Sequence, residues 1–173
     1  PLNRYMSEQE LIESMNMNTI TDAKGDRHLM SVPLTQDITS ADKKRLEGQS
    51  QVAITWKDQL VALIENPEIY ENRKEEICAK TFGTRSVKHP KIARIEQQGE
   101  FLISGESMKF TSEITYGDGL DQYRMTPEQI SKIAQERGAD AVYAFQVRNP
   151  LHNGHCLLLK ECRKELINQG YKN

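Results

Sequence analysis

The chain has 173 residues, enough for one domain or for one domain and part of a second. Hydrophobic residues make up 37% of it and charged residues 28%, which is compatible with a packed globule. The net charge of −2 argues against a broad basic surface, and no apolar run approaches the roughly 20 residues that span a bilayer, so we expect neither a nucleic-acid nor a membrane partner.

The N-terminal sequence and the cysteine content of the chain indicate its cellular compartment. No signal peptide is visible, and the three cysteines are an odd number without metal-site spacing. We therefore expect reduced thiols and a location in the cytoplasm or the nucleus. Position 1 is proline rather than an initiator methionine, so we expect the chain to be a piece of a longer one.

In chain order, the first predicted elements are two short helices. Residues 6–15 favour a helix in which Ser7 and Glu10 form a reciprocal capping box. Residues 40–46 favour a helical turn, and we expect Ser40 to cap it.

A β-hairpin is the clearest strand signal. Residues 51–65 contain two apolar runs on either side of Lys57 and Asp58, although the turn lacks a glycine. Residues 100–106 are expected to form a further strand. The first part of the chain is therefore predicted to mix short strands with helices.

A longer helix is predicted directly after the hairpin. Over residues 66–83, Asn66 would be its cap, Pro67 its first residue and Gly83 its terminator. Residues 89–99 predict another short helix.

The last part of the chain has a different pattern. Residues 116–125 contain two glycines and two aspartates and are typical of a boundary. Residues 126–138 predict a helix that begins with a capping box of Thr126 and Gln129. Residues 139–147 predict a buried parallel strand, and residues 153–170 a second helix. This order is the opening of an α/β domain, and because one strand cannot make a sheet, that domain is expected to be incomplete.

Polar side chains gather between the predicted strand and the last helix. The loop after a parallel strand lies at the edge of the sheet where α/β folds bind ligands, and free amides at a helix start favour an anion. Arginine offers a planar fork to a tetrahedral oxyanion, and the amides and imidazoles can donate to phosphate oxygens. The cluster consists of Gln146, Arg148, Asn149, His152 and His155.

This cluster has two other interpretations. A single histidine or arginine at such a place is more often a surface or capping residue, but five such side chains within ten residues favour a functional site over packing alone. A metal site would use His152 and His155, yet no third ligand is near in sequence, so we predict no metal site. The chain also has no glycine-rich phosphate loop or dinucleotide fingerprint.

Residues 146–155, "QVRNPLHNGH", resemble the Gln-x-Arg-Asn-Pro-x-His-x-x-His motif of ATP sulfurylases (sulfate adenylyltransferases). The His-x-Gly-His core is shared with the wider class I nucleotidyltransferase superfamily. Further stretches, "PLTQDIT", "HPKIARI" and "DGLDQYRMTPEQI", are also similar to this family, and most of all to the sulfurylase part of animal-type bifunctional PAPS synthases. The opening "PLNRYM" departs from the family pattern at Arg4 and Tyr5.

The resemblance implies an α+β fold. A PUA-like β-rich N-terminal domain would occupy residues 1–118, and the first, incomplete unit of a Rossmann-like α/β nucleotidyltransferase domain would occupy residues 119–173. It implies sulfate adenylyltransferase activity, in which ATP and sulfate give adenosine 5′-phosphosulfate (APS) and pyrophosphate. This is the first step of sulfate activation towards PAPS, and it uses Mg²⁺ as MgATP.

The resemblance also implies a role for each residue of the motif. Gln146 and Arg148 would bind sulfate, and Asn149 would bind the ATP phosphates. His152 and His155 would stabilise charge on the α- and β-phosphates in the transition state, so the catalytic set would be Arg148, Asn149, His152 and His155. Val147 could contribute only its backbone amide, and the ATP-binding set would be Gln146, Val147, Arg148, Asn149, His152 and His155.

The sequence also leads to expectations about partners, and two alternative functions remain open. The resemblance implies an APS kinase domain in the same parent chain and a homodimer, and we expect the 173-residue piece by itself to be inactive. One alternative is a PUA-like RNA-binding module, against which the acidic charge argues. Another is a different enzyme with the His-x-Gly-His core that adenylylates another acceptor.

Overall fold

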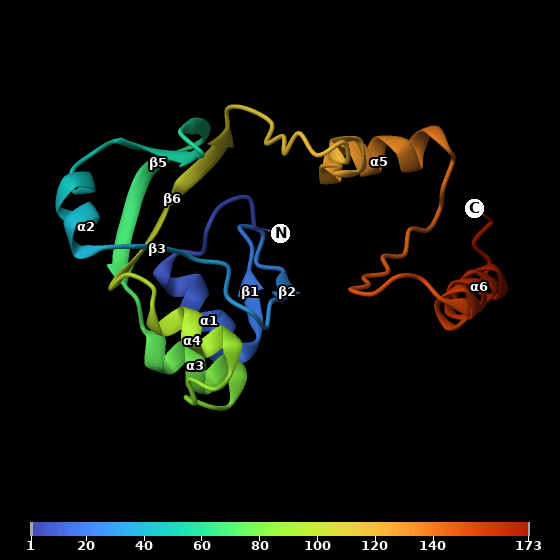
Figure 1. The fold of residues 1–173 in the computed structure, drawn as a ribbon, viewed down its shortest axis with the longest axis horizontal. Coiled ribbons are helices and arrows are strands. Elements are labelled where there is room, and N and C mark those ends of the chain that lie inside the picture. The colour runs from blue at the N-terminus through green and yellow to red at the C-terminus, as the bar shows by residue number, and fades with distance from the viewer. Residues whose placement is uncertain (1, 173) are drawn as a thin grey trace. The chain divides into compact units, whose positions relative to one another are not determined.

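A computed structural model describes residues 2–172. The chain divides into two compact units, residues 1–114 and 115–173, and each has its own secondary structure (Figure 1). The elements of the first unit are α1 (Glu8–Met17), β1 (Thr19–Thr21), β2 (Arg27–Leu29), β3 (Gln36–Ile38), α2 (Ser40–Leu46), β4 (Gln51–Trp56), β5 (Gln59–Glu71), α3 (Lys74–Phe82), α4 (Pro90–Glu96) and β6 (Phe101–Phe110). Those of the second are a 3₁₀ turn (Asp121–Tyr123), α5 (Pro127–Glu136) and α6 (Asn153–Asn168). The mixture of helices and strands confirms the predicted α+β class.

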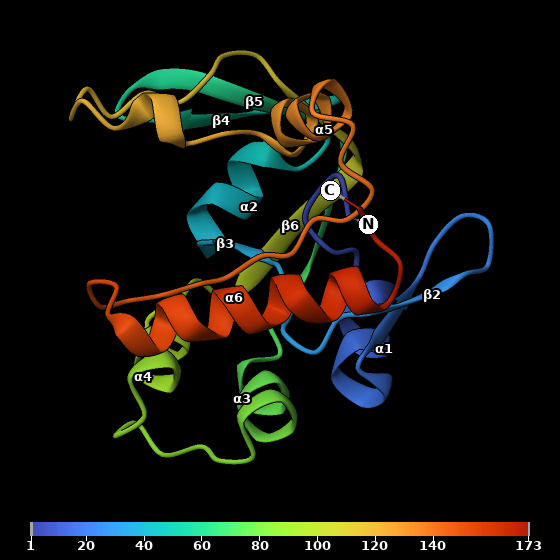
Figure 2. The same cartoon turned by 90° about the vertical axis from the view of Figure 1, so that its right-hand side faces the viewer.

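An antiparallel sheet of four strands organises the first unit. Its order is β3-β6-β5-β4, and the long strand β5 pairs with β6 from Ala62 opposite Phe110 to Glu71 opposite Phe101. β1 and β2 form a separate hairpin beside α1, which Figure 2 shows as an arm.

Both faces of the four-stranded sheet are covered. Leu102 and Ile103 are successive residues of β6, so their side chains point to opposite faces, and each belongs to a different hydrophobic cluster. On the Leu102 face, apolar side chains of α1, α3 and α4 pack against the sheet. On the Ile103 face, Leu46 of α2 packs in a cluster with Ile103. Each fully buried leucine or isoleucine contributes roughly 1.5–3 kcal/mol to the free energy of unfolding.

The helix caps follow the predictions with one correction. Ser7 and Glu10 form the expected capping box of α1, and Arg4 adds an ion pair of 2.6 Å to Glu10. The expected cap at Ser40 is wrong, because Thr39 has the extended backbone that a cap needs and caps α2 instead. The Ser40 hydroxyl donates a hydrogen bond of 3.1 Å to Glu100.

The hairpin of β4 and β5 is confirmed. Lys57 and Asp58 form its two-residue turn with φ of 49° and 64°. Positive φ at both positions is the mark of the type I′ turn, whose twist matches that of the strands. The turn therefore forms without the glycine that usually relieves this conformation.

The helix predicted for residues 66–83 is wrong in its first half. β5 continues through Asn66 and Pro67, and α3 begins only at Lys74. Asn66 has φ of 47°, and from Pro67 onward β5 pairs with β6 alone, a position of the kind where a sheet tolerates proline. Pairing with a distant strand has overridden a local helix-start signal. The predicted terminator Gly83 is correct, with φ of 66°.

The second unit begins with a segment folded around Arg124. Its guanidinium pairs with Asp118 and Asp121 at 2.5 and 2.7 Å, and it lies 4.5 Å from the centre of the Tyr116 ring. α5 follows with the predicted capping box, formed by Thr126 and Gln129.

The buried strand predicted for residues 139–147 is wrong. The segment between α5 and α6 forms no strand, and Val142 is 68% exposed. A parallel strand needs neighbouring strands to pair its backbone and cover its side chains, and the described residues of this unit supply none. None of those residues is buried.

α6 is a single uninterrupted helix (Figure 2). Within residues 2–172, no helix is long and apolar enough to cross a membrane.

Candidate functional site

Two histidines close the N-terminus of α6. His152 is the cap residue, and its Nδ1 accepts the backbone N–H of Gly154 at 3.1 Å. His155 occupies the third helical position, and its Nδ1 accepts the backbone N–H of His152 at 3.3 Å. The pattern is a capping box in which imidazoles replace the usual hydroxyl and carboxylate. The helix start therefore fixes both rings.

The same two rings stack on each other. Their centroids are 3.9 Å apart, with 26° between the ring planes. The ring of Phe145 meets that of His155 in a T-shaped contact with centroids 5.6 Å apart. His155 thus contacts two aromatic rings, and it is less exposed than His152 or Phe145.

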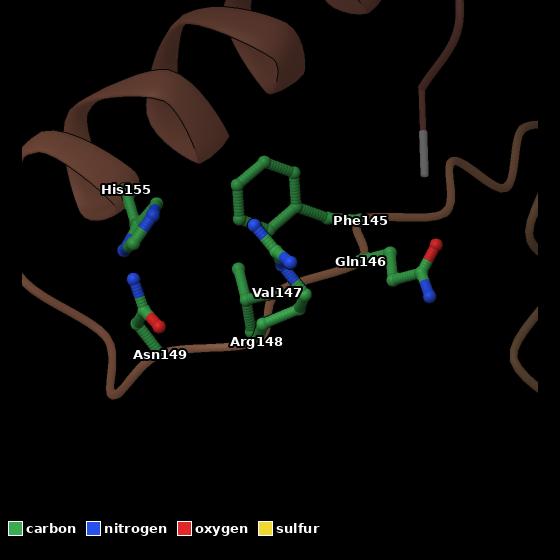
Figure 3. Close-up of a pocket in the computed structure, with 6 residues that line it drawn as sticks. All are labelled: Phe145, Gln146, Val147, Arg148, Asn149 and His155. Atoms are coloured by element: carbon green, nitrogen blue, oxygen red, sulfur yellow. The ribbon is translucent and has the colours of Figure 1, made fainter. Parts of the chain in front are cut away.

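A pocket of about 320 Å³ lies beside this helix start. Figure 3 shows that the side chain of Gln146 extends away from the other five, which lie around the pocket. The residues that line it are Phe145, Gln146, Val147, Arg148, Asn149 and His155. The stretch between the helices, though not a strand, therefore gathers most of the predicted site residues at one place.

Arg148 and Asn149 supply polar groups with no partner in the described chain. Both are exposed, and within residues 2–172 neither side chain makes a hydrogen bond or an ion pair. A guanidinium in this state can bind an oxyanion through two parallel hydrogen bonds. The positive end of the α6 dipole favours an anion at the same end of the helix, although the Gly154 amide there is already bonded to His152.

The structure brings together most, but not all, of the predicted set. The predicted residues that line the pocket are Gln146, Val147, Arg148, Asn149 and His155. His152 lies outside the lining and stacks on His155. Within the described chain, no group of three or more His, Cys, Asp or Glu residues could hold a metal ion.

Two residues of this site were missed in the sequence. Phe145 lies in an apolar run, which indicated a buried strand residue rather than a pocket wall. Gly154 stands between the histidines, and a Cβ there would lie 3.0 Å from Cε1 of the His152 ring. The spacing of His152 and Gly154 was a usable signal, because a cap residue bonds the amide two or three positions ahead.

Comparisons with known proteins match both parts of the chain. A family model for a PUA-like domain matches residues 1–111, and one for ATP-sulfurylase matches residues 121–169. The chain is 38% identical over 175 residues to "ATP sulfurylase 2" of Arabidopsis thaliana, covering 100% of the chain and 37% of that relative. It is 38% identical over 176 residues to "ATP sulfurylase 4, chloroplastic" of the same plant, again covering 100% and 37%. A "Sulfate adenylyltransferase" of Desulfovibrio desulfuricans is 29% identical over 174 residues, with 92% of the chain and 40% of the relative covered. The chain thus spans well under half of the length of these curated relatives.

Proposed function

Because the chain belongs to the PUA-like domain family over residues 1–111 and to the ATP-sulfurylase family over residues 121–169, we propose that it carries part of a sulfate adenylyltransferase active site. In this reaction a sulfate oxygen attacks the α-phosphorus of MgATP. The bond from the α-phosphorus to the oxygen that bridges it to the β-phosphorus breaks, and pyrophosphate leaves. The products are APS and pyrophosphate, and Mg²⁺ enters as part of the MgATP substrate.

The unpaired guanidinium of Arg148 carries this proposal. Two anions must approach each other for the reaction, so the site needs a fixed positive group without a competing carboxylate. Arg148 has no ion pair within residues 2–172 and lines the pocket at the N-terminus of α6. Its planar fork fits two oxygens of a tetrahedral sulfate.

Gln146 is proposed as the second sulfate ligand. It belongs to the lining of the pocket, and its side chain extends away from the other five lining side chains in Figure 3, so we expect it to turn towards an anion held by Arg148. Val147 lies between them and is proposed to contribute its backbone amide to ATP.

Asn149 and the two histidines are proposed to act on the phosphates of ATP. Asn149 lines the pocket with its amide unpaired, and His155 faces the same pocket from the first turn of α6. No covalent intermediate is needed, so the contribution of these groups is to position the two anions and to stabilise the charge that develops.

The wider organisation is part of the proposal. We place the PUA-like domain at residues 1–118 and the start of the catalytic domain at 119. The likeness of "DGLDQYRMTPEQI" to animal sequences supports a bifunctional PAPS synthase, with an APS kinase domain in the same chain. A homodimer in the cytoplasm or the nucleus belongs to the same proposal.

The test replaces Arg148 by lysine in the longest protein that the gene produces. Lysine keeps the charge but loses the fork, so sulfate-dependent pyrophosphate release should fall by roughly 10²- to 10³-fold, which corresponds to about 2.7–4 kcal/mol of transition-state stabilisation. Arg163→Lys, on an exposed face of α6, is the matched control and should leave the rate unchanged.

Two outcomes would contradict the proposal. Wild-type turnover in Arg148→Lys would remove the sulfate role of Arg148. Pyrophosphate release that depends on another acceptor and not on sulfate would assign the site to a different adenylyltransferase.

A further inference from the structure

The two imidazoles of the candidate site use the same ring nitrogen for the helix cap. Nδ1 of His152 accepts the N–H of Gly154, and Nδ1 of His155 accepts the N–H of His152. A ring nitrogen that accepts a hydrogen bond carries no hydrogen, so in a neutral imidazole the hydrogen must lie on Nε2. We propose that this reciprocal cap holds both histidines as neutral Nε2–H donors, with Gly154 and Phe145 as the positioning residues.

Gly154 makes room for the first ring. An ideal Cβ at this position would lie 3.0 Å from Cε1 and 3.1 Å from Nδ1 of His152, closer than most real Cβ contacts. A side chain would therefore displace the His152 ring by a few tenths of an ångström and strain its hydrogen bond to the Gly154 N–H. Helix formation does not explain the glycine, because alanine is the better helix former.

Phe145 holds the second ring from the other direction. Its ring meets that of His155 at an interplanar angle of 67°, a preferred geometry for aromatic pairs. His155 also stacks on His152, so two ring contacts and one hydrogen bond restrict its side-chain torsions. Phe145 is 37% exposed and lines the pocket, so core packing does not account for it.

The tautomer decides what the histidines can offer a substrate. The consequence for substrate rests on the proposed function, whereas the tautomer itself does not. With Nδ1 committed to the backbone, each ring has a single remaining donor, Nε2–H, and adding a proton at Nδ1 would set N–H against N–H and break the cap. Both rings would thus donate hydrogen bonds to phosphate oxygens as neutral groups, and Arg148 would supply the fixed positive charge.

The test observes the ring nitrogens of the longest protein that the gene produces, without ATP or sulfate. Long-range proton–nitrogen NMR correlations of the ¹⁵N-labelled chain, assigned with single His→Asn variants, distinguish a bare ring nitrogen from one that carries hydrogen. Nδ1 of His152 and of His155 should resonate as bare nitrogens, and Nε2 of both as N–H. His89, exposed and outside this cap, is the internal reference.

Variants separate positioning from folding. Gly154→Ala should leave the helical circular dichroism unchanged but shift the His152 nitrogens toward the average of both tautomers, whereas the neighbouring Asn153→Ala should leave them as in the wild type. Phe145→Leu should shift the His155 nitrogens in the same way, and Phe145→Tyr should restore them. Val142→Ala, in the same segment, is the control for Phe145.

Each contrary result would contradict one stated part of the proposal. Hydrogen on Nδ1 of either ring, or an even tautomer mixture in the wild-type chain, would overturn the cap. Unchanged nitrogen shifts in Gly154→Ala or Phe145→Leu would overturn the positioning role of that residue. Because no substrate is present, these results stand whether or not the protein adenylylates sulfate.

Discussion

The hydroxyl of Tyr70 donates a hydrogen bond of 2.6 Å to the backbone carbonyl of Met6. Tyr70 lies on β5, and on the neighbouring β6 the hydroxyl of Ser104 donates at 2.5 Å to the carbonyl of Tyr5. Burial raises the pKa of the Tyr70 phenol above its ordinary value of 10.0, which keeps it a donor. Two strands therefore bind the segment before α1 to the sheet.

Tyr70→Phe should destabilise the first unit. The change leaves the carbonyl of Met6 buried without its partner, at a cost of about 1–3 kcal/mol in the free energy of unfolding. Urea denaturation of the chain measures this, with the exposed Tyr123→Phe as the control. Equal midpoints for Tyr70→Phe and the wild type would show that the bond contributes nothing.

Removing either histidine should lower turnover more than it raises the Michaelis constant for ATP. This follows if the imidazoles donate mainly to charge that develops during transfer. His152 also caps α6, and alanine would lose that cap at about 1 kcal/mol, so His152→Asn, which keeps a capping side chain, is the better variant beside His155→Ala. Steady-state kinetics, with His89→Ala as control, gives both constants. An unchanged turnover number with weaker ATP binding would make the histidines ground-state ligands.

The 173-residue chain by itself should release no pyrophosphate above background. Its pocket is lined by one loop and the first turn of α6, and none of the described residues of the second unit is buried. Such a site cannot exclude water or surround both anions. A coupled pyrophosphate assay decides the matter. Release that needs both sulfate and Mg²⁺, and that is lost in Arg148→Ala, would contradict this expectation.

The boundary segment should be sensitive to acid. A hydrogen bond from Arg124 lowers the pKa of Asp118 from 3.8 to about 2. Because the folded pKa lies below the unfolded one, the stabilisation is complete above pH 3.8 and is lost as the pH falls through about 2. A carbon-13 NMR titration of the carboxyl groups measures this.

Arg124→Gln should return the Asp118 midpoint towards 3.8. The midpoint of Asp42, whose pKa is lowered by a hydrogen bond from Arg45 in the other unit, should not move. If the titration midpoint of Asp118 is the same in Arg124→Gln as in the wild type, the Arg124–Asp118 ion pair does not form.

Local signals in the sequence predicted local structure well. The capping boxes at Ser7 and Thr126 depend on residues within one helical turn, and both are confirmed, as is the hairpin turn at Lys57. The family was also predictable, because the order of residues 146–155 matches one motif, and the family comparisons confirm it. The roles given to the individual residues of that motif stay predictions.

Features that depend on distant partners could not be predicted locally. Asn66 and Pro67 carry a helix-start signal, yet pairing with β6 keeps them in a strand. Phe145 lies in an apolar run that predicts a strand, but a strand forms only where other strands can pair with it. Its contact with His155 needs the chain to turn back, and no periodicity in the sequence indicates that turn.

The Asn66–Pro67 pair also affects whether the open edge of β5 can pair with a strand of another copy of the chain. Beyond Glu65, β5 runs past the end of β4 with one neighbouring strand among the described residues, and such an edge can recruit a foreign strand into the sheet. Proline has no N–H to offer a foreign strand, and the left-handed Asn66, whose own N–H bonds Ser50, interrupts the flat geometry of the strand. We therefore expect the two residues that carry the helix-start signal to hinder edge-to-edge pairing of the folded chain.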